Sequence, residues 1–321
     1  MSRSVLVLLN RSAGTGHDPG LSDQLAAAVR EGYGAALDVS TAVLDDHPGV
    51  RTAAAAFAVS STHPALVIAA GGGGTLRAVV EGVMDAFPKA PPPPESVLLA
   101  GLRMGSGHVV ARRLGVPRDP LVAARQIGGE LRGGSVRFCS VMRCTHGTSD
   151  GGTATRHAVT MCGLGQWGQV PGYISRWRAR HGAARRRAAA LVGLERVNLL
   201  EYFAFGAARL LAGTVSATQC ELVELDGSRQ VRLLAAVALN LPLPPLPHPG
   251  VTMSEDAAGL IVVPRMGRPF RRRLEPGADF AVRLLDRESV EFFLDEDSER
   301  ATGWLRLGMA GCVGFVPGSA V

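Results

Sequence analysis

The sequence has 321 residues, of which 46% are hydrophobic and 19% are charged. One hydrophobic core stops growing at about 250 to 300 residues, and this composition excludes a largely disordered chain, so we expect a globular protein with two domains. The net charge is +6, but Lys89 is the only lysine and no G-x-x-x-x-G-K-[ST] stretch is present, which excludes a P-loop nucleotide site.

Secretion and membrane insertion are also unexpected. The first apolar run, residues 5–9, is too short for a signal peptide, and no stretch of about 18 uninterrupted apolar residues could span a bilayer. The five cysteines form no C-x-x-C pair, which indicates reduced, buried thiols: Cys139, Cys144, Cys162, Cys220 and Cys312. We therefore expect a cytoplasmic protein.

The N-terminal part alternates strands with helices. Apolar runs predict strands over residues 5–9, 36–43, 65–70 and 96–102. Helical spacing follows each of them, over residues 21–30, over 50–60, through Val79, Val80 and Val83, and through Ala111 and Leu114. This alternation predicts a doubly wound, Rossmann-like α/β domain whose ligands bind at the carboxyl ends of parallel strands.

The pattern of apolar residues changes near Val136, from alternating strands and helices to mostly strands. Strand-like segments follow over residues 136–142, 158–162, 218–225, 231–239, 260–263, 280–285 and 290–294. Residues 174–211 are the exception, since arginine-rich and apolar residues there predict one or two helices. We therefore expect a nucleotide-binding α/β domain over residues 1–135 and a β-rich sandwich domain over residues 136–321, whose last strand could return to the first domain.

Two of the predicted strands end in glycine clusters at the start of a helix. Gly71 to Gly74 follow one strand, with Thr75 placed to cap the next helix, and Gly105 to Gly107 follow another. Such turns expose backbone N–H groups to an anion at the positive end of the helix dipole, so phosphate is the expected ligand. The alternative is that these glycines only make tight strand-to-helix connections.

Read in order, three segments resemble the diacylglycerol kinase and sphingosine kinase superfamily of lipid kinases. Residues 8–14 resemble its opening strand and N-P-x-S-G turn, residues 68–82 its G-G-D-G-T-L-N-E-V-V-N-G segment, and residues 102–117 its P-x-G-T-G-N-D-F-A-R segment with the L-G-I-P that follows. Weaker similarity continues to residues 315–317. The resemblance implies a fold like that of NAD kinase and diacylglycerol kinase.

The resemblance also implies an ATP-dependent kinase that uses Mg²⁺ and phosphorylates a hydroxyl of diacylglycerol or a related lipid. Asp295 would be the general base, with Asp297 as its acidic neighbour. The alternative for these two aspartates is an exposed acidic turn. The implied ATP-binding residues are Asn10, Ser12, Gly14, Gly71, Gly72, Gly73, Gly74, Thr75, Gly105, Ser106 and Gly107.

Several acidic positions of the family pattern are replaced in this sequence. Gly73 stands for the aspartate of G-G-D-G-T, His108-Val109 for N-D, and Arg77-Ala78 for N-E, while Ala258 and Val262 replace the aspartates of D-G-L-L-D-V. These changes remove the oxygen ligands that Mg²⁺ prefers, so no metal ligand is assigned. Arg77 or His108 could substitute through cationic phosphate contacts. A catalytically silent relative that binds nucleotide or lipid and regulates is therefore the alternative function.

A kinase acting on NAD or a sugar phosphate shares the glycine loop and stays open, although residues 111–117 favour the lipid branch.

Arginines and aromatic residues gather between the predicted strands. A helix in this segment could lie on anionic lipid, on the inner membrane face. It would carry arginines within residues 176–180 and 185–187, followed by the apolar and aromatic residues 199–205. A solvated arginine face over a packed helix is the equal alternative. The expected partners are a lipid substrate and an anionic membrane, with no nucleic acid, and a homodimer stays open.

Overall fold

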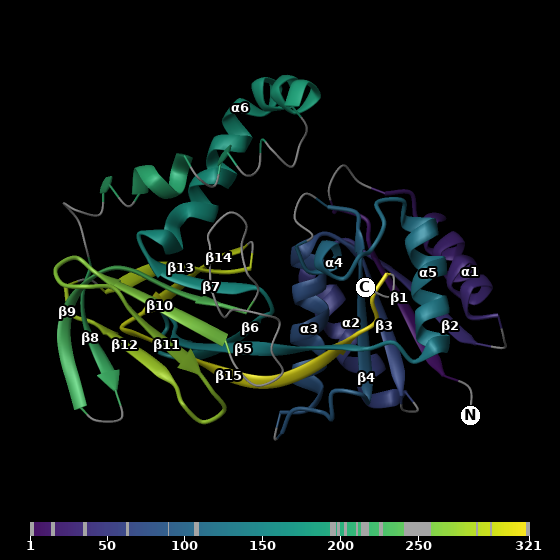
Figure 1. Cartoon of the computed structure of the whole chain (residues 1–321), viewed down its shortest axis with the longest axis horizontal. Coiled ribbons are helices and arrows are strands. Elements are labelled where there is room, and N and C mark those ends of the chain that lie inside the picture. The colour runs from purple at the N-terminus through teal and green to yellow at the C-terminus, as the bar shows by residue number, and fades with distance from the viewer. Residues whose placement is uncertain are drawn as a thin grey trace. The chain divides into compact units, whose positions relative to one another are not determined.

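The computed structural model describes residues 3–13, 17–34, 37–61, 64–88, 90–105, 109–192, 197, 200–201, 204–209, 211–212, 218–224, 227–240, 258–286, 288–295 and 297–318. They form two compact units (Figure 1). Unit 1 comprises Met1–Val141, Met253–Glu255 and Ala310–Val321, and unit 2 comprises Met142–Thr252 and Asp256–Met309. The domain boundary expected after residue 135 stays a prediction.

Unit 1 is built on a parallel sheet in the order β15-β4-β3-β1-β2. The strands are β1 (Ser4–Asn10), β2 (Asp38–Leu44), β3 (Ala65–Gly71), β4 (Val97–Arg103) and the end of β15 (Trp304–Phe315). All seven residues of β3 are buried, as expected of a strand whose sheet is covered on both faces. Helices α2 (His47–Ser60) and α3 (Gly73–Ala86) cover one face, and α1 (Leu21–Tyr33) and α5 (Pro120–Gly133) cover the other (Figure 1).

Local capping residues fix where these helices begin. The Asp46 carboxylate accepts the N–H of Gly49 at the start of α2, and the Asp119 carboxylate accepts the N–H groups of Leu121 and Val122 at the start of α5. Helix α5 ends at Gly133 and is capped by Gly134, whose φ of 75° is left-handed. The short helix α4 (Val109–Arg113) lies between β4 and α5. Helix α5 lies in a stretch for which the sequence analysis predicts no element.

The contact between α1 and α5 depends on glycines of both helices, since a Cβ added at Gly32 would lie 1.8 Å from the carbonyl oxygen of Arg125. A Cβ added at Gly128 would lie 2.3 Å from the carbonyl oxygen of Val29, whereas the nearest atom to a Cβ at Gly129 is 3.8 Å away. We expect Gly128→Ala to lower the free energy of unfolding by about 1–3 kcal/mol through overpacking. Gly129→Ala should be neutral or raise it by about 0.4–1 kcal/mol. Urea unfolding of the two variants checks this, and equal stabilities would contradict the close packing.

Unit 2 is an antiparallel assembly. Its main path runs β14-β13-β7-β9-β8-β12 and then to β15, while β10 pairs with β9 and β11, and β6 pairs with β5. The remaining bounds are β5 (Arg137–Gly147), β6 (Thr153–Ala158), β7 (Met161–Gly165), β8 (Thr218–Glu224), β9 (Gly227–Leu239), β10 (Ala258–Pro264), β11 (Phe270–Leu274), β12 (Phe280–Leu284), β13 (Ser289–Leu294) and β14 (Asp297–Thr302). A mixed α/β unit followed by a β-rich antiparallel unit confirms the expected fold class.

One predicted strand is wrong in detail. Residues 158–162 do not form a single strand, because β6 ends at Ala158 and β7 begins at Met161. Val159 and Thr160 form a bend between them, and the N–H groups of residues 159–161 turn toward the carboxylate of Asp295 instead of a neighbouring strand. The prediction of a strand fails here because a tertiary hydrogen bond outweighs the local preference of β-branched residues.

The core of unit 2 holds buried thiols. Cys144, Cys162 and Cys220 are buried, and the five cysteines are free. Burial, and secondarily the negative charge of Asp286, raises the pKa of Cys220 from 9.0 to about 12. Burial likewise raises the pKa of Cys144 well above its ordinary value. Four of the five cysteines are free and buried as expected, whereas Cys312 is free but partly exposed.

A pH dependence follows from the raised pKa of Cys220. Below pH 9 the thiol is protonated in both the folded and the unfolded chain, so it has no effect. Between pH 9 and about 12 the unfolded chain releases the proton first, so stability falls as the pH rises. We expect melting temperatures measured from pH 8 to 11 to fall less steeply for Cys220→Ala than for the wild type. Equal slopes would contradict the raised pKa.

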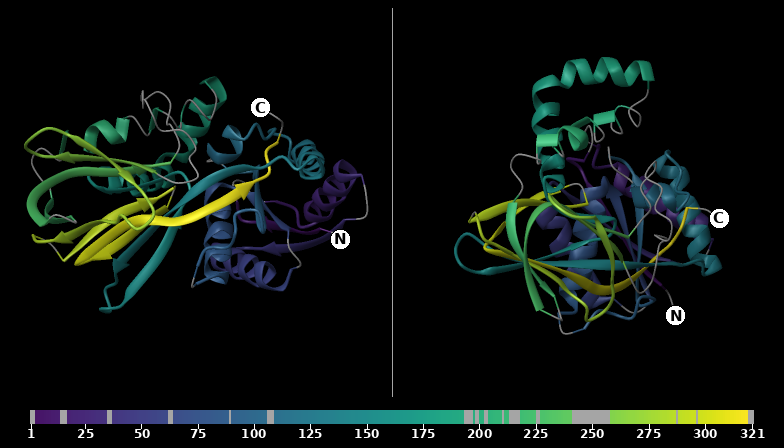
Figure 2. Two further views of the ribbon diagram at one scale, coloured as in Figure 1. Left: turned by 60° about the horizontal axis from the view of Figure 1, so that its bottom comes forward. Right: turned by 60° about the vertical axis from the view of Figure 1, so that its left-hand side comes forward.

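Unit 2 also carries helix α6 (Val170–Val192), preceded by a 3₁₀ turn at Trp167–Gln169 (Figure 2). Helix α6 is bent at His181, where φ is −117° and ψ is 23°. The described residues within 200–212 are helical as well. Among the residues that the structure describes, no helix is both long and apolar enough to cross a membrane.

Candidate functional site

The predicted nucleotide-binding residues that are described lie at the carboxyl edge of the sheet in unit 1. Strands β1 and β3 are neighbours and end at Asn10 and Gly71. The Asn10 side chain links the loops that follow them, because Nδ2 donates to Oγ1 of Thr75 at 3.1 Å and Oδ1 accepts the N–H of Ser12 at 3.1 Å. Asn10 is buried, so these bonds fix the first loop against the start of α3.

The two glycine turns touch each other through their backbones. A Cβ added at Gly105 would lie 2.4 Å from the Cα of Gly72, and one added at Gly72 would lie 3.3 Å from the Cα of Gly105. The N–H of Met104 donates to the carbonyl of Gly71 at 3.1 Å, which joins the end of β4 to the end of β3. Side chains at Gly72 or Gly105 would force these turns apart, so glycine is required by packing at this edge.

Helix α3 begins at this edge with an open N-terminus. Its N-cap, Gly72, gives no side-chain capping bond, and Gly73, Gly74 and Thr75 form its first turn. The first N–H groups of a helix have no partner within it and carry the positive end of the dipole. The arrangement can therefore bind an anion such as a phosphate.

Arg77 lies one turn further along α3 and is engaged in a buried ion pair. Its Nη1 lies 3.5 Å from Oε1 of Glu81, and Arg51 of α2 lies 3.2 Å from the other carboxylate oxygen. Arg77 and Glu81 are 8% and 5% exposed. Arg77, at the asparagine position of the family's N-E, is thus paired within α3, while Glu81 also joins α3 to α2 through Arg51. Contact of Arg77 with a phosphate would compete with Glu81.

Two neighbours of this edge are not among the residues predicted from the sequence. Asp45, just after β2, pairs with Arg11 at 2.7 Å, and its carbonyl accepts the Ser12 hydroxyl at 2.6 Å. The signal was available, because Asp45 follows a predicted strand at the same edge. His17 contacts the carbonyl of Met104 through Nε2 at 3.3 Å. The predicted residues Gly14, Ser106 and Gly107, with His108, lie outside the described residues.

The carboxylate of Asp295 is held by a network of hydrogen bonds in unit 2. Strands β13 and β14 form a hairpin in which Leu294 pairs with Asp297, and Asp295 lies in its turn with a left-handed φ of 54°. Its Oδ1 accepts the N–H of Thr160 at 2.7 Å, the hydroxyl of Thr160 at 2.6 Å and the N–H of Met161 at 3.1 Å. Its Oδ2 accepts the N–H of Val159 at 3.1 Å. The side chain is therefore not part of an exposed acidic turn.

This network extends to Asn240 at the end of β9. The Asn240 side chain donates to the carbonyl of Val159 at 2.9 Å, and its N–H donates to the carbonyl of Thr160 at 2.9 Å. Asn240 is fully buried and Asp295 is 8% exposed. Thr160 is a site residue that sequence reasoning misses, since nothing local links it to an aspartate more than a hundred positions away. Asp297 starts β14 beside this turn.

The donor set in the described residues does not fit a resident metal ion. Mg²⁺ prefers carboxylate and other oxygen ligands. Among the residues that the structure describes, no group of three or more histidine, cysteine, aspartate or glutamate side chains could hold a metal. This agrees with the replacement of the acidic positions of the family pattern, which include Gly73 and Ala78.

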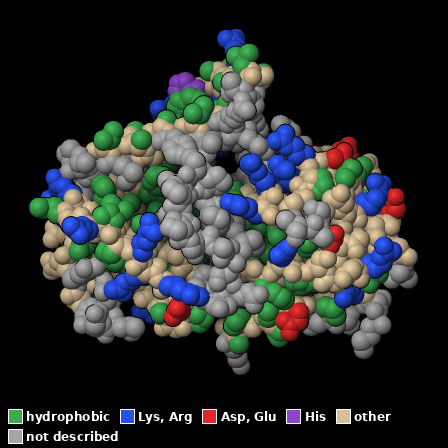
Figure 3. Space-filling view, in the orientation of Figure 1, with side chains coloured by type: hydrophobic (Ala, Val, Ile, Leu, Met, Phe, Trp, Pro, Cys, Tyr) green, Lys and Arg blue, Asp and Glu red, His purple; other side chains and the backbone are tan. Residues whose placement is uncertain are grey.

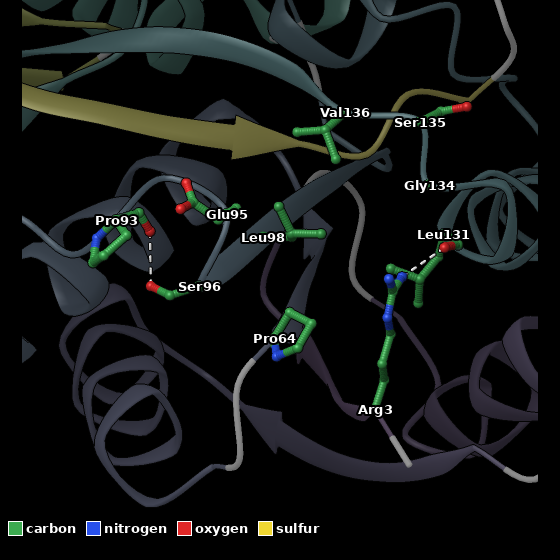
Figure 4. Close-up of a pocket in the computed structure, with 10 residues that line it drawn as sticks. All are labelled: Arg3, Pro64, Pro93, Glu95, Ser96, Leu98, Leu131, Gly134, Ser135 and Val136. Carbon is green, nitrogen blue, oxygen red and sulfur yellow. Dashed lines mark hydrogen bonds between the residues drawn. The ribbon is translucent and has the colours of Figure 1, made fainter. Parts of the chain in front are cut away.

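A cavity of about 420 Å³ lies in unit 1, away from the carboxyl edge (Figure 4). Arg3, Pro64 and Ser96 of its lining directly precede β1, β3 and β4, which places the cavity at the amino ends of the strands. The remaining lining residues are Pro93, Glu95, Leu98, Leu131, Gly134, Ser135 and Val136. None of the predicted site residues lines it.

The fold and the edge geometry of unit 1 define an α/β unit of the class that binds phosphate-bearing ligands at the carboxyl ends of its strands. Residues 4–138 match the family described as diacylglycerol kinase catalytic domain. The resemblance found in the sequence is therefore confirmed over these residues. No curated protein sequence matches the chain significantly.

Solved structures extend the likeness to nearly the whole chain. A diacylglycerol kinase from Bacillus anthracis str. Sterne matches with a TM-score of 0.58 and 13% identity, over 98% of this chain and 97% of that chain. A second structure from the same strain, provisionally assigned as a diacylglycerol kinase, matches with a TM-score of 0.59 and 14% identity, over 99% of each chain. At this identity the matches show a shared fold.

Proposed function

We propose that the chain is an ATP-dependent lipid kinase that transfers the γ-phosphate to a hydroxyl of diacylglycerol or a related lipid. The observation that carries this proposal is the joined carboxyl edge of unit 1, where the bond from Asn10 to Thr75 and the contact of Gly72 with Gly105 bring three loops to one open helix N-terminus. Backbone N–H groups there would hold the ATP phosphates. No step is assigned to Mg²⁺ bound by protein side chains.

Asp295 would receive the proton of the attacking hydroxyl. Three donors occupy Oδ1, whereas Oδ2 accepts a single N–H, which leaves this oxygen with capacity for a substrate hydroxyl. A fixed carboxylate with one such oxygen suits a general base. Asp297 would be its acidic neighbour, and the lipid would be presented at an anionic membrane.

A silent, nucleotide- or lipid-binding regulator is the second candidate. It is favoured by two observations on α3: Ala78 stands at the glutamate position of the family's N-E, and Arg77, at the asparagine position, is already paired with Glu81. In that case the glycine loops would bind nucleotide without transfer.

Calorimetric titration of ATP with and without Mg²⁺, followed by transfer of labelled γ-phosphate to a mixed lipid extract, separates the candidates. ATP binding with a labelled lipid product is the expected result. Binding without a product would establish the silent relative, and the absence of ATP binding would overturn both readings of the glycine loops.

A further inference from the structure

The hydrogen bonds of Asp295 to the described part of the chain all involve one short segment, residues 159–161. Its carboxylate accepts the N–H groups of Val159, Thr160 and Met161 and the hydroxyl of Thr160. Its own N–H donates to the carbonyl of Met161 at 2.8 Å. Asp295 is also the one non-glycine residue with a left-handed φ among the residues that the structure describes. Since this backbone conformation is unfavourable for a residue with a Cβ, it depends on the contacts with segment 159–161.

The donors that hold Asp295 are uncharged, in contrast to those around the acidic residues of the surface. On the face seen in Figure 3, basic side chains are more widespread than acidic ones. Exposed carboxylates such as Asp45 and Glu31 pair with arginines. Asp295 is buried, and its described partners are N–H groups and one hydroxyl. The position of its carboxylate therefore follows the position of segment 159–161.

Asn240 holds the other side of this segment. The N–H groups of Val159 and Thr160 donate to Asp295, whereas their carbonyls accept from Asn240. Nδ2 of Asn240 donates to the carbonyl of Val159 at 2.9 Å, and the N–H of Asn240 donates to the carbonyl of Thr160 at 2.9 Å. Asn240 directly follows β9, whose last residue pairs with the first residue of β7. Its side chain thus adds a hydrogen bond beyond the end of this ladder.

Burial makes the amide of Asn240 hard to replace. Asn240 and Val159 are 0% and 1% exposed, so water does not take over the bond between them when the amide is removed. Leucine is of similar size but leaves the carbonyl of Val159 without its donor. Aspartate has the shape of asparagine, but it presents an acceptor to that carbonyl and adds a negative charge behind the segment that holds Asp295.

We propose that Asn240 is a positioning residue for Asp295, an inference that rests on the proposed function. Through the carbonyls of Val159 and Thr160 it keeps the N–H groups of segment 159–161 on the carboxylate. Oδ1 of Asp295 then stays occupied by three donors, and Oδ2 keeps its capacity for a substrate hydroxyl. Asn240 acts on the carboxylate and not on the substrates, so its loss should lower kcat and leave the KM values unchanged.

Steady-state transfer of labelled γ-phosphate to diacylglycerol tests this role. Asn240→Leu and Asn240→Asp should lower kcat by about tenfold to a hundredfold, with the KM values for ATP and diacylglycerol within about twofold of wild type. The smaller change Asn240→Ser should act in the same direction and serves if the larger changes do not fold. A kcat equal to that of wild type, or a change confined to KM, overturns the inference.

Val282→Ala is the matched structural control. Val282 is buried in β12, which β9 and β8 separate from β7. The cavity left by the truncation should lower Tm, as the Asn240 variants do, while kcat stays at the wild-type value. An equal fall of kcat in Val282→Ala would show that lost stability alone lowers transfer, which overturns the inference.

A double variant tests whether Asn240 acts through Asp295. Asp295→Asn combined with Asn240→Leu should transfer no more slowly than Asp295→Asn alone, because residues that act as one unit have non-additive effects. A further loss of about tenfold or more in the double variant overturns the inference.

Amide hydrogen exchange measures the positioning without catalysis. In Asn240→Leu and Asn240→Ser the amides of Val159, Thr160 and Met161 should exchange at least about tenfold faster than in wild type, while those of β12 keep their wild-type rates. Unchanged protection of segment 159–161 overturns the inference. If wild type transfers no phosphate, the kinase proposal fails, and faster exchange in these variants still establishes that Asn240 holds the segment on which Asp295 depends.

Discussion

Replacing Asp295 with asparagine is expected to lower phosphate transfer by about two to four orders of magnitude, the usual contribution of a general base, while leaving ATP affinity unchanged. The amide keeps one oxygen for the three donors that Oδ1 accepts, namely both groups of Thr160 and the N–H of Met161. Its NH₂ group would face the N–H of Val159, two donors without an acceptor. The free energy of unfolding should fall by about 1–3 kcal/mol as well.

Thr160→Val separates the chemical effect from the structural one. It removes the hydroxyl that donates to Oδ1 of Asp295 at 2.6 Å but keeps the carboxylate. We expect a loss of about 1 kcal/mol in stability and transfer within a few-fold of wild type. Chemical denaturation and transfer of labelled γ-phosphate are measured on both variants. If Asp295→Asn transfers as fast as wild type, Asp295 has no role as a base.

Gly105→Ala should reduce ATP affinity by at least tenfold. Its Cβ would lie 2.4 Å from the Cα of Gly72, and because both partners are backbone, the two turns must separate. The N–H groups at the start of α3 would then no longer converge on one phosphate. Calorimetric titration with ATP measures the loss.

Gly129→Ala is the matched control for this substitution, since its Cβ would meet nothing closer than 3.8 Å. It should bind ATP as wild type does. Wild-type affinity in Gly105→Ala, with the fold intact by circular dichroism, would show that the contact of the two turns is unrelated to nucleotide binding.

The α/β unit was predictable because its signals are local. The run over β3 is entirely apolar and stops at glycines, so one short segment of sequence indicates both the strand and the turn that ends it. Helix α5 was missed although Asp119-Pro120 at its start and Gly134 after its end are ordinary helix boundary signals. That omission came from reading apolar periodicity without the caps.

The surroundings of the site were less accessible to sequence reasoning. The position of Asp295 followed from the motif, but its four hydrogen bonds depend on a bend at Val159 and Thr160 that strand propensity argues against. Likewise, Arg77 looked like a cation available to phosphate until its partner Glu81 was seen one helical turn away. Long-range pairing of polar groups leaves no periodic trace in a sequence.

The return of β15 to unit 1 has a consequence for the order in which the protein can fold during synthesis. Gly314 and Phe315 pair with Leu98 and Leu99 of β4, and the N–H of Val316 donates to the carbonyl of Leu99, so one edge of the parallel sheet is closed by a segment made long after β4 itself. Until this segment is made, β4 presents an unpaired apolar edge, a template for association with other chains. Expression of residues 1–141 alone should for this reason give an aggregating fragment.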